Sequence, residues 1–275
     1  MKTTNTTSFP GAILAGAVLL LCSQAAFAQD ASDESKKLAA LAQNPIASAI
    51  SLPLQYNYNG GYGRNNSRGG SIFNVQPVIP FSLGDDWNLV TRAIIPIVDL
   101  PVGAHRKSGL SDINFTGFLS PAKAGKWIWG IGPIMTFPTA SDDFLGSEKT
   151  SMGPAFVALR MHGPWVYGGL LNNQWSIAGD DDREDVNSML FNPFLNYNIP
   201  NSKGWYLTTG PNITANWQAD SDDVWTLPVG GGVGKVFKIG TQACNAKVAY
   251  YNNVMTPDGG PEDTIQLQFT FLFPN

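Results

Sequence analysis

Charge is scarce in this 275-residue chain. Charged residues make up 14% of it, against about 25% in an average soluble domain, and there are only two histidines and two cysteines. The net charge of −4 and the lack of a basic stripe argue against nucleic acid as a partner. Aromatic residues reach 11%, which argues against a disordered chain. Glycine and uncharged polar residues are abundant instead.

Long apolar runs are also missing, with one exception at the start of the chain. Residues 11–22 (GAILAGAVLLLC) follow Lys2 and precede Ala26-Phe27-Ala28, which is typical of a secretory signal peptide cleaved after residue 28. The run is too short for a spanning helix, which needs about 20 residues. Cys22 leaves a lipoprotein alternative open, although Leu21 is bulky for the position before a lipidated cysteine. We predict a signal peptide over 1–28 and an exported mature chain.

Removal of the signal peptide leaves Cys244 as the single thiol of the mature chain. An exported protein with one cysteine forms no intramolecular disulfide, so packing or hydrogen bonding must hold the fold. We expect Cys244 to fill a small apolar space rather than to react.

One helix-capable segment follows the signal peptide. Within residues 30–47, Leu38, Leu41 and Ala42 share one helical face, and Asn44-Pro45 stops the pattern. We interpret residues 29–47 as a short periplasmic N-terminal segment. Its amphipathic face leaves a plug or a partner-docking element as an alternative.

From residue 48 onward, apolar and polar residues alternate with a period of two, which indicates strands with one apolar face. The clearest example runs from Trp205 to Trp217, where one register is largely apolar and the other almost wholly polar. The pattern predicts twelve strands, near 48–58, 70–80, 87–98, 109–119, 126–138, 149–161, 164–177, 186–198, 204–217, 223–238, 241–254 and 262–273.

Three observations favour a membrane barrel over a soluble sandwich. The segments are about 11 residues long, as in tilted bilayer-crossing strands, whereas soluble strands are commonly about 5 or 6 residues. Tryptophan and tyrosine gather at segment ends, where interfacial belts form. Connections after odd-numbered strands are roomy and polar, for example 59–69 and 99–108, and those after even-numbered strands are mostly tight. Short periplasmic turns and longer external loops produce this alternation.

Prolines inside the predicted strands run against this interpretation. Each removes a donor from the ladder, and proline is normally confined to sheet edges or bulges. A closed barrel has no edges, so we expect bulges or glycine-assisted bends at Pro53, Pro77, Pro96, Pro133, Pro154, Pro193, Pro211 and Pro228.

Several stretches resemble a bacterial outer-membrane family filed under the meta-pathway of phenol degradation, some members of which carry a "neuromedin U" label. They are 42–59 (AQNPIASAISLPLQYNYN), 73–97, 109–121, the Gly-Pro-led segments 132–138 and 153–159, and 191–200. The resemblance covers most of the mature chain. It implies a β-barrel that passes small or aromatic molecules and brings no catalytic residues with it.

We therefore predict an all-β fold, in which residues 48–275 form a twelve-stranded antiparallel transmembrane β-barrel. Charged residues should face the lumen, because Arg or Lys facing lipid at the midplane costs about 2–4 kcal/mol. Arg92 and Asp112 could pair, and with Lys247 they could form a selective constriction; the alternative is that such residues are internal struts. The candidate pore-lining residues are Arg92, Asp112, Asn114, Arg160, Asn192, Asn196, Asn212, Asn216, Lys247 and Asn253.

Neither a metal site nor an active site is predicted. The external loops are acidic, which hydration explains, and the run Asp180-Asp181-Asp182 lacks the spacing and glycine of an EF-hand loop. A lipase-type barrel needs a serine beside a positioned histidine, and His105 and His162 lie in connections without one. GxSxG and HExxH motifs are absent. We expect no cofactor.

Twelve strands fall between the eight that side chains just fill and the roughly 16 to 18 that leave an aqueous channel. We predict an outer-membrane barrel with a narrow polar lumen that passively passes small solutes, including aromatic or hydrophobic ones. The alternative is a closed structural or adhesion barrel whose acidic loops bind cations, lipopolysaccharide or surface partners; a soluble periplasmic β-protein ranks third. The expected surroundings are outer-membrane lipid and lipopolysaccharide, and the oligomeric state stays open.

Overall fold

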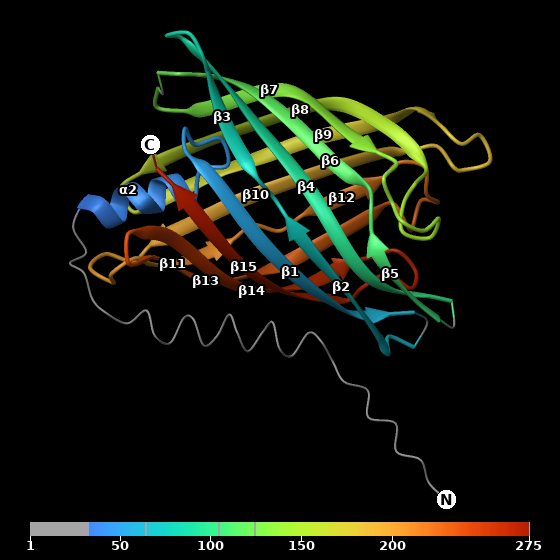
Figure 1. Cartoon of the computed structure of the whole chain (residues 1–275). Coiled ribbons are helices and arrows are strands. Elements are labelled where there is room, and N and C mark those ends of the chain that lie inside the picture. The colour runs from blue at the N-terminus through green and yellow to red at the C-terminus, as the bar shows by residue number, and fades with distance from the viewer. Residues whose placement is uncertain (1–32, 64, 104, 124, 275) are drawn as a thin grey trace, which may run out of the picture.

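The computed structural model describes residues 33–274 except 64, 104 and 124, so the predicted signal peptide lies outside the described residues. The described chain forms helix α2 (Asp33–Ala42) and one closed antiparallel barrel of twelve spans, which confirms the predicted fold class (Figure 1). Three spans consist of two strands each. The strands are β1 (Ile50–Tyr62), β2 (Arg68–Val75) with β3 (Val78–Leu83), β4 (Trp87–Val102), β5 (His105–Leu110) with β6 (Ile113–Pro121), β7 (Ile128–Phe137), β8 (Lys149–His162), β9 (Trp165–Gly179), β10 (Asn187–Asn198), β11 (Trp205–Thr209) with β12 (Ile213–Asn216), β13 (Trp225–Ile239), β14 (Gln242–Met255) and β15 (Asp263–Phe273).

The last strand closes the barrel against the first. β15 pairs with β1 from Ile50↔Phe273 to Gly60↔Asp263, and every span also pairs with its neighbours in the chain. Closure leaves no sheet edge, which is the condition for placing strands in lipid with their amide groups hydrogen-bonded.

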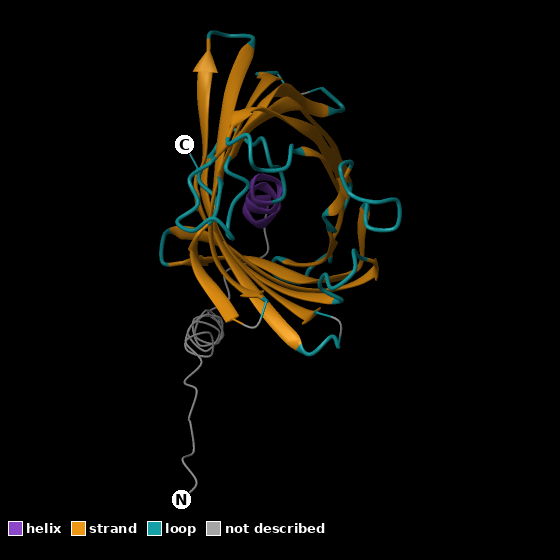
Figure 2. Cartoon of the chain, turned by 90° about the vertical axis from the view of Figure 1, so that its right-hand side faces the viewer, coloured by secondary structure: helices purple, strands orange, loops and turns teal. Residues whose placement is uncertain are grey.

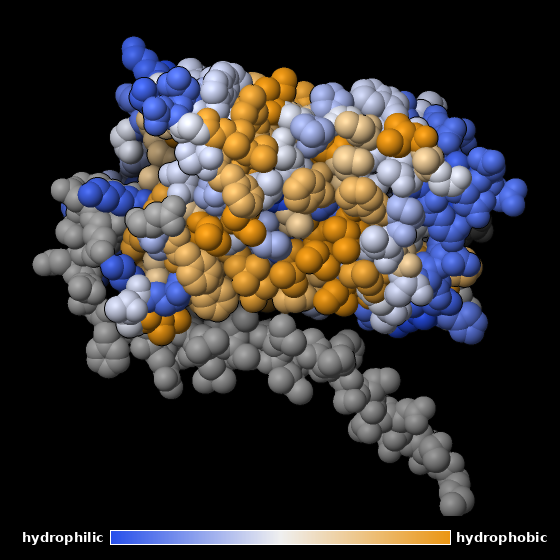
Figure 3. All heavy atoms as spheres, turned by 45° about the horizontal axis from the view of Figure 1, so that its top comes forward, coloured by the Kyte–Doolittle hydropathy of each residue, from blue (hydrophilic) through white to orange (hydrophobic). Residues whose placement is uncertain are grey.

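The outer surface of the barrel is apolar. Along β11, Leu207 is exposed while Tyr206 beside it is buried, and along β14 Val248 is exposed while Ala249 is buried. Figure 3 shows the resulting apolar band over the middle of the barrel and a hydrophilic surface at one end. Exposed tryptophans stand at both margins of the band, at residues 87, 127, 165 and 205 on one side and 175 and 217 on the other. These positions suit interfacial aromatic belts.

The prolines mark breaks in the wall. The breaks within spans fall at Pro77, at Pro211, and at Ser111, whose N–H donates to the carbonyl of Pro96. Pro133 and Pro154 lie opposite each other on β7 and β8. The ladder skips pairs beside each of them, toward β6 and toward β9 respectively. These prolines thus lie where the adjacent strand is not paired with them, so no backbone N–H is required at their positions.

The two ends of the barrel differ. The turn end holds the connections after β3, β6, β8, β10 and β13, together with α2 and the C-terminus of β15, and the loop end lies opposite. Two connections that the sequence predicted to be roomy are hairpins instead. β1 and β2 continue pairing out to Tyr62↔Arg68, and β4 and β5 to Val102↔His105. Polar residues there extend strands rather than form loops, because ladder pairing does not require apolar side chains.

Helix α2 lies inside the barrel at the turn end, surrounded by the strands, as the view along the barrel shows (Figure 2). Leu38 and Ala39 pack against Tyr206, Val236 and Leu272 on the inner wall. Gln43 and Asn198 exchange hydrogen bonds between their side-chain amides at 2.9 and 3.2 Å. Among the described residues, no helix has the length and apolar character needed to cross a bilayer.

A second apolar cluster fills the rest of the turn end. Ile46 packs with Phe118, Val157, Leu159 and other inward residues of β3 to β9. The side chains of Val157 and Leu159 are fully buried. Cys244 is fully buried too, but in the outward register of β14, between its ladder partners Phe237 and Phe271. The barrel interior is therefore solid at the turn end.

Candidate functional site: the barrel lumen

A cavity of about 730 Å³ occupies the lumen on the loop-end side of this packed region. Its floor includes residues 41–45, the end of α2 and the turn that follows. Its lining reaches Leu100 and Ser188, close to the loop-end termini of β4 and β10. The lumen is thus hollow toward the loop end and floored at the turn end.

The cations and the phenylalanines of the cavity lining lie on different strands. Both sides are mixed, since Ile72, Ile94 and Val98 line the cation side and Asn172, Gln174 and Asn192 line the phenylalanine side. Inward residues of β14, β15, β1, β2 and β4, with one residue from the break between β2 and β3, form a surface that we call the cation–amide wall: Arg92, Lys247, Gln55, Asn57, Asn74, Gln76, Asn245, Gln266 and Gln268. Inward residues of β6 to β10 form the apolar patch: Phe118, Ile134, Ala155, Leu170, Leu190 and Phe194. β8 and β15 lie half a ring apart in the strand order, so the two surfaces face each other across the lumen.

Six of the ten predicted pore-lining residues line this cavity: Arg92, Asn114, Asn192, Asn196, Asn212 and Lys247. Asn192 Nδ2 donates to the carbonyls of Gly210 and Pro211 at 3.1 and 2.9 Å, and so bridges the break between β11 and β12. Asn114 Nδ2 donates to Thr136 Oγ1 at 3.0 Å. These asparagines combine a lining position with a strut role in the wall.

The predicted Arg92–Asp112 pair is wrong. Arg92 Nη2 donates to Gln76 Oε1 at 2.5 Å. Arg92 is in register with Thr116, four residues further along the chain than Asp112, a separation of about 13 Å of strand. Alternation along a strand indicates which face a residue occupies, but it carries no information about the height of that residue relative to the neighbouring strand.

Lys247 occupies the middle of β14, opposite Gly234 on one side and Gln268 on the other. Its side chain lines the cavity and, within the described part of the chain, makes no hydrogen bond or ion pair. On the β13 side the ring of Tyr206 covers Gly234, where a Cβ would collide with it.

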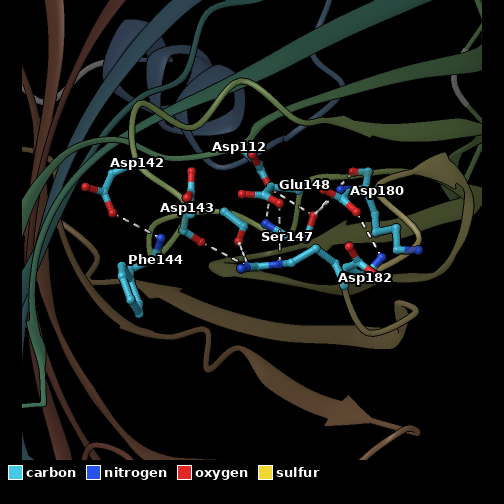
Figure 4. Close-up of polar contacts among 11 residues, drawn as sticks. Asp112, Asp142, Asp143, Phe144, Ser147, Glu148, Asp180 and Asp182 are labelled. Carbon is cyan, nitrogen blue, oxygen red and sulfur yellow. Dashed lines mark hydrogen bonds and ion pairs between the residues drawn. The ribbon is translucent and has the colours of Figure 1, made fainter.

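Asp112 holds a loop rather than lining the cavity. It lies in the break between β5 and β6 and accepts hydrogen bonds from Ala140 N at 3.2 Å, Ser147 N at 2.7 Å and Ser147 Oγ at 2.9 Å (Figure 4). The loop held in this way, residues 138–148, is called the mouth loop below. Its Leu145 is buried near Gly109, so the loop folds onto the wall at the loop end.

Charged side chains fasten the mouth loop further. Lys107 Nζ lies 2.6 Å from Asp142 Oδ2, and Arg183 donates to the carbonyls of Asp143 and Gly146 at 3.0 and 2.7 Å. The hydrogen bond from Lys107 lowers the pKa of the Asp142 carboxyl. That contact therefore persists above the ordinary aspartate pKa and is lost only as the pH falls through the lowered value.

Three further predicted positions lie outside the cavity lining. Arg160 follows the fully buried Leu159 on β8 and pairs with Tyr167, so it occupies the outward register near the turn end, and its predicted place in the lumen is wrong. An outward arginine is tolerated there because its side chain can reach the interface. Asn216 and Asn253 stand at the loop end, where Asn216 caps Gln218 N and Asn253 Nδ2 donates to the carbonyl of Pro261.

The glutamines and Tyr206 line the cavity although they are not among the predicted pore-lining residues. Gln55, Gln266 and Gln268 form much of the cation–amide wall, and Tyr206 Oη donates to Asn245 Oδ1 at 2.9 Å. The polar register of 262–273 was a usable indication for Gln266 and Gln268. Tyr206 was harder to assign, because a tyrosine near a strand end also suits an outward belt.

Neither the loop carboxylates nor the histidines form a recognisable reactive centre. Within the described residues, no group of three or more His, Cys, Asp or Glu side chains is placed to hold a metal ion. Asp185 is held by Ser176 and lies 3.4 Å from Lys149, contacts that lower the pKa of its carboxyl. His105 begins β5 at the loop end and His162 ends β8 at the turn end, so the two histidines do not converge.

No family model and no curated protein matches the sequence. Among solved structures, the COG4313 outer membrane channel from Pseudomonas putida F1 is similar with a TM-score of 0.63 at 15% identity, over 84% of this chain and 98% of that one. The NanC porin is similar with a TM-score of 0.50 at 10% identity, over 81% and 99%. The chain has the barrel fold of these outer-membrane channels.

Proposed function

We propose that this protein is an outer-membrane channel that passively passes small solutes, without cofactor or energy source. The observation that carries the proposal is a hollow polar lumen inside a closed barrel with an apolar outer band. The fold shared with outer-membrane channels supports it. In this proposal the signal peptide is removed after Ala28, the barrel spans 48–275, and the loop end meets lipopolysaccharide.

Aromatic or hydrophobic solutes are part of the proposal. The apolar patch supplies a surface of the size and chemistry that such solutes need, and the sequence resemblance to the phenol-degradation family agrees. A cavity of about 730 Å³ lies within the roughly 300–1,000 Å³ of small-molecule sites. The floor at residues 41–45 must move or leave a narrow path for passage to occur.

Reconstitution of the full mature chain into planar bilayers tests the proposal. We expect discrete conductance steps, smaller than those of a wide porin because the lumen is narrow. Silence at every voltage and salt concentration would contradict passage.

The floor also supports a second candidate, a closed barrel whose cavity opens only toward the cell exterior. Such a protein would hold a solute or a surface partner at the loop end without passing it. The two candidates differ in conductance, and they also differ in uptake: only a channel lets proteoliposomes release a trapped small solute.

A further inference from the structure

The charge of the lumen has one sign. The cavity lining contains the cations Arg92 and Lys247 and, among the described residues, no carboxylate. The acidic side chains of the chain concentrate at the loop end instead, for example Asp142, Asp185 and Glu262. Solutes inside the barrel therefore meet positive charge without a compensating acid.

The two cations keep free donors. Arg92 spends one of its N–H groups on the neutral amide of Gln76, and a guanidinium has five. Lys247 makes no contact of this kind within the described chain. A charge removed from bulk water needs a counter-charge or hydrogen-bond partners, and an anion offers both through charge-assisted hydrogen bonds.

The neighbouring amides satisfy one another in part, and Gln266 Oε1 is buried without a hydrogen-bond partner among the described residues. Gln55 and Gln266 both donate to Asn57 Oδ1, at 3.1 and 3.2 Å, and Gln268 donates to Thr270 Oγ1 at 3.0 Å. These contacts hold the cation–amide wall in place. Arg92 and Lys247 are thus the strongest donors left for a solute.

We propose, building on the proposed passage of solutes, that the lumen binds an organic monoanion with an apolar body, such as an aromatic carboxylate. Arg92 and Lys247 attract the carboxylate into the lumen, and the apolar patch receives the body. Neither surface alone would select this class: the cations accept any small anion, and the patch accepts any apolar molecule.

The acidic loop end works against anion entry but does not cancel the site. Loop carboxylates lie in water, where screening acts over about 8 Å at physiological salt, and some are neutralised by Lys107, Lys149 and Arg183. Lumenal charges are screened less. We expect anion selectivity to rise as salt increases from low to physiological concentration.

Two measurements on the full mature protein test the site. In bilayers under a KCl gradient, the reversal potential should indicate preference for chloride, and benzoate should interrupt the current more strongly than acetate or benzyl alcohol. By equilibrium dialysis in detergent, labelled benzoate should bind, and the double variant Arg92→Gln/Lys247→Gln should weaken binding about tenfold or more.

Matched controls remove a cation from the outer surface. Lys235→Gln alters β13 beside Lys247, because Lys235 pairs with Ala246 and its ammonium stacks on Trp205. Arg160→Gln removes the outward arginine of β8. Both should leave selectivity and benzoate binding unchanged. The heat-dependent gel shift of a folded barrel checks that each variant is folded.

The outcomes separate the two proposals. Conductance without anion preference, or benzoate binding unchanged in the folded double variant, overturns the anion site while passage stands. Benzoate binding that depends on Arg92 and Lys247 in a protein that never conducts supports the site and contradicts passage.

Discussion

Glycine before proline has a steric role in this wall. A Cβ at Gly132 would collide with the carbonyl oxygen of Gly117, and one at Gly153 with the carbonyl oxygen of Asn173. These are the carbonyls that approach where the ladder skips Pro133 and Pro154. The absent side chain allows neighbouring strands to stay close where a hydrogen bond is missing.

Gly132→Ala should therefore destabilise the barrel, by about 1–3 kcal/mol, because the backbone must shift. Gly117→Ala on the adjacent strand is the control, since its Cβ would meet only Leu89 Cδ1 at 3.6 Å. Urea unfolding in lipid vesicles measures both. Equal stability of the two variants would refute the steric role.

Asp112 is the anchor of the mouth loop, so Asp112→Ala should release it. The amides of Ala140 and Ser147 lose their acceptor, and hydrogen exchange at Ser147 should quicken by roughly tenfold or more. Asp181→Ala, in the next loop, should leave that exchange rate unchanged. If hydrogen exchange at Ser147 stays slow in the Asp112 variant, the contacts of Lys107 and Arg183, rather than those of Asp112, hold the mouth loop in place.

Sequence alternation was a good guide to side-chain direction and a poor guide to contact. The period of two along a strand accounts for the position of Arg92, Lys247 and four asparagines in the cavity lining. It failed for Arg160, where an arginine near the turn end tolerates the outward register. It also failed for the Arg92–Asp112 pair, because register between strands depends on hairpins and breaks that local pattern does not encode.

At the scale of elements, helix α2 decides whether the lumen is closed. Leu38 and Ala39 bury their side chains against β11, β13 and β15, and Gln43 is tied to Asn198 of β10. The amphipathic segment was identified from the sequence, but its place was not. A short helix with one apolar face fits a membrane surface, a partner or a barrel interior equally well.

Leu38→Asp should expel the helix from the turn end, because a carboxylate would face Tyr206, Val236 and Leu272. We expect larger conductance steps or more frequent opening in bilayers. Lys37→Asp is the control, since Lys37 is exposed. Unchanged conductance in the folded Leu38 variant would show that the helix does not limit passage.

All twelve predicted spans were recovered, yet three of them are interrupted and two expected loops are hairpins. The apolar register identifies a span, because side chains that face the lipid must be apolar along the whole membrane-crossing segment. Beyond the bilayer an apolar register is no longer required, so the sequence does not mark where pairing stops within the predicted connections 59–69 and 99–108.

For the whole molecule, embedding in a bilayer predicts that an outward charge costs stability according to depth. Val248 is exposed at the middle of β14, and Ile239 is exposed at the turn-end terminus of β13. Val248→Arg should destabilise the folded barrel by about 2–4 kcal/mol and Ile239→Arg by about 0–1 kcal/mol. Refolding titrations in lipid vesicles give both values. Equal costs at the two depths would argue against a spanning orientation.

The position of α2 also has a consequence for the order in which the barrel folds. The helix precedes every strand in the chain, yet the surfaces that receive it come from β11, β13, β14 and β15. Its full docking surface exists only when the C-terminal strands β11 to β15 are in place. A segment that precedes all the strands therefore reaches its native contacts only after the last strands have formed.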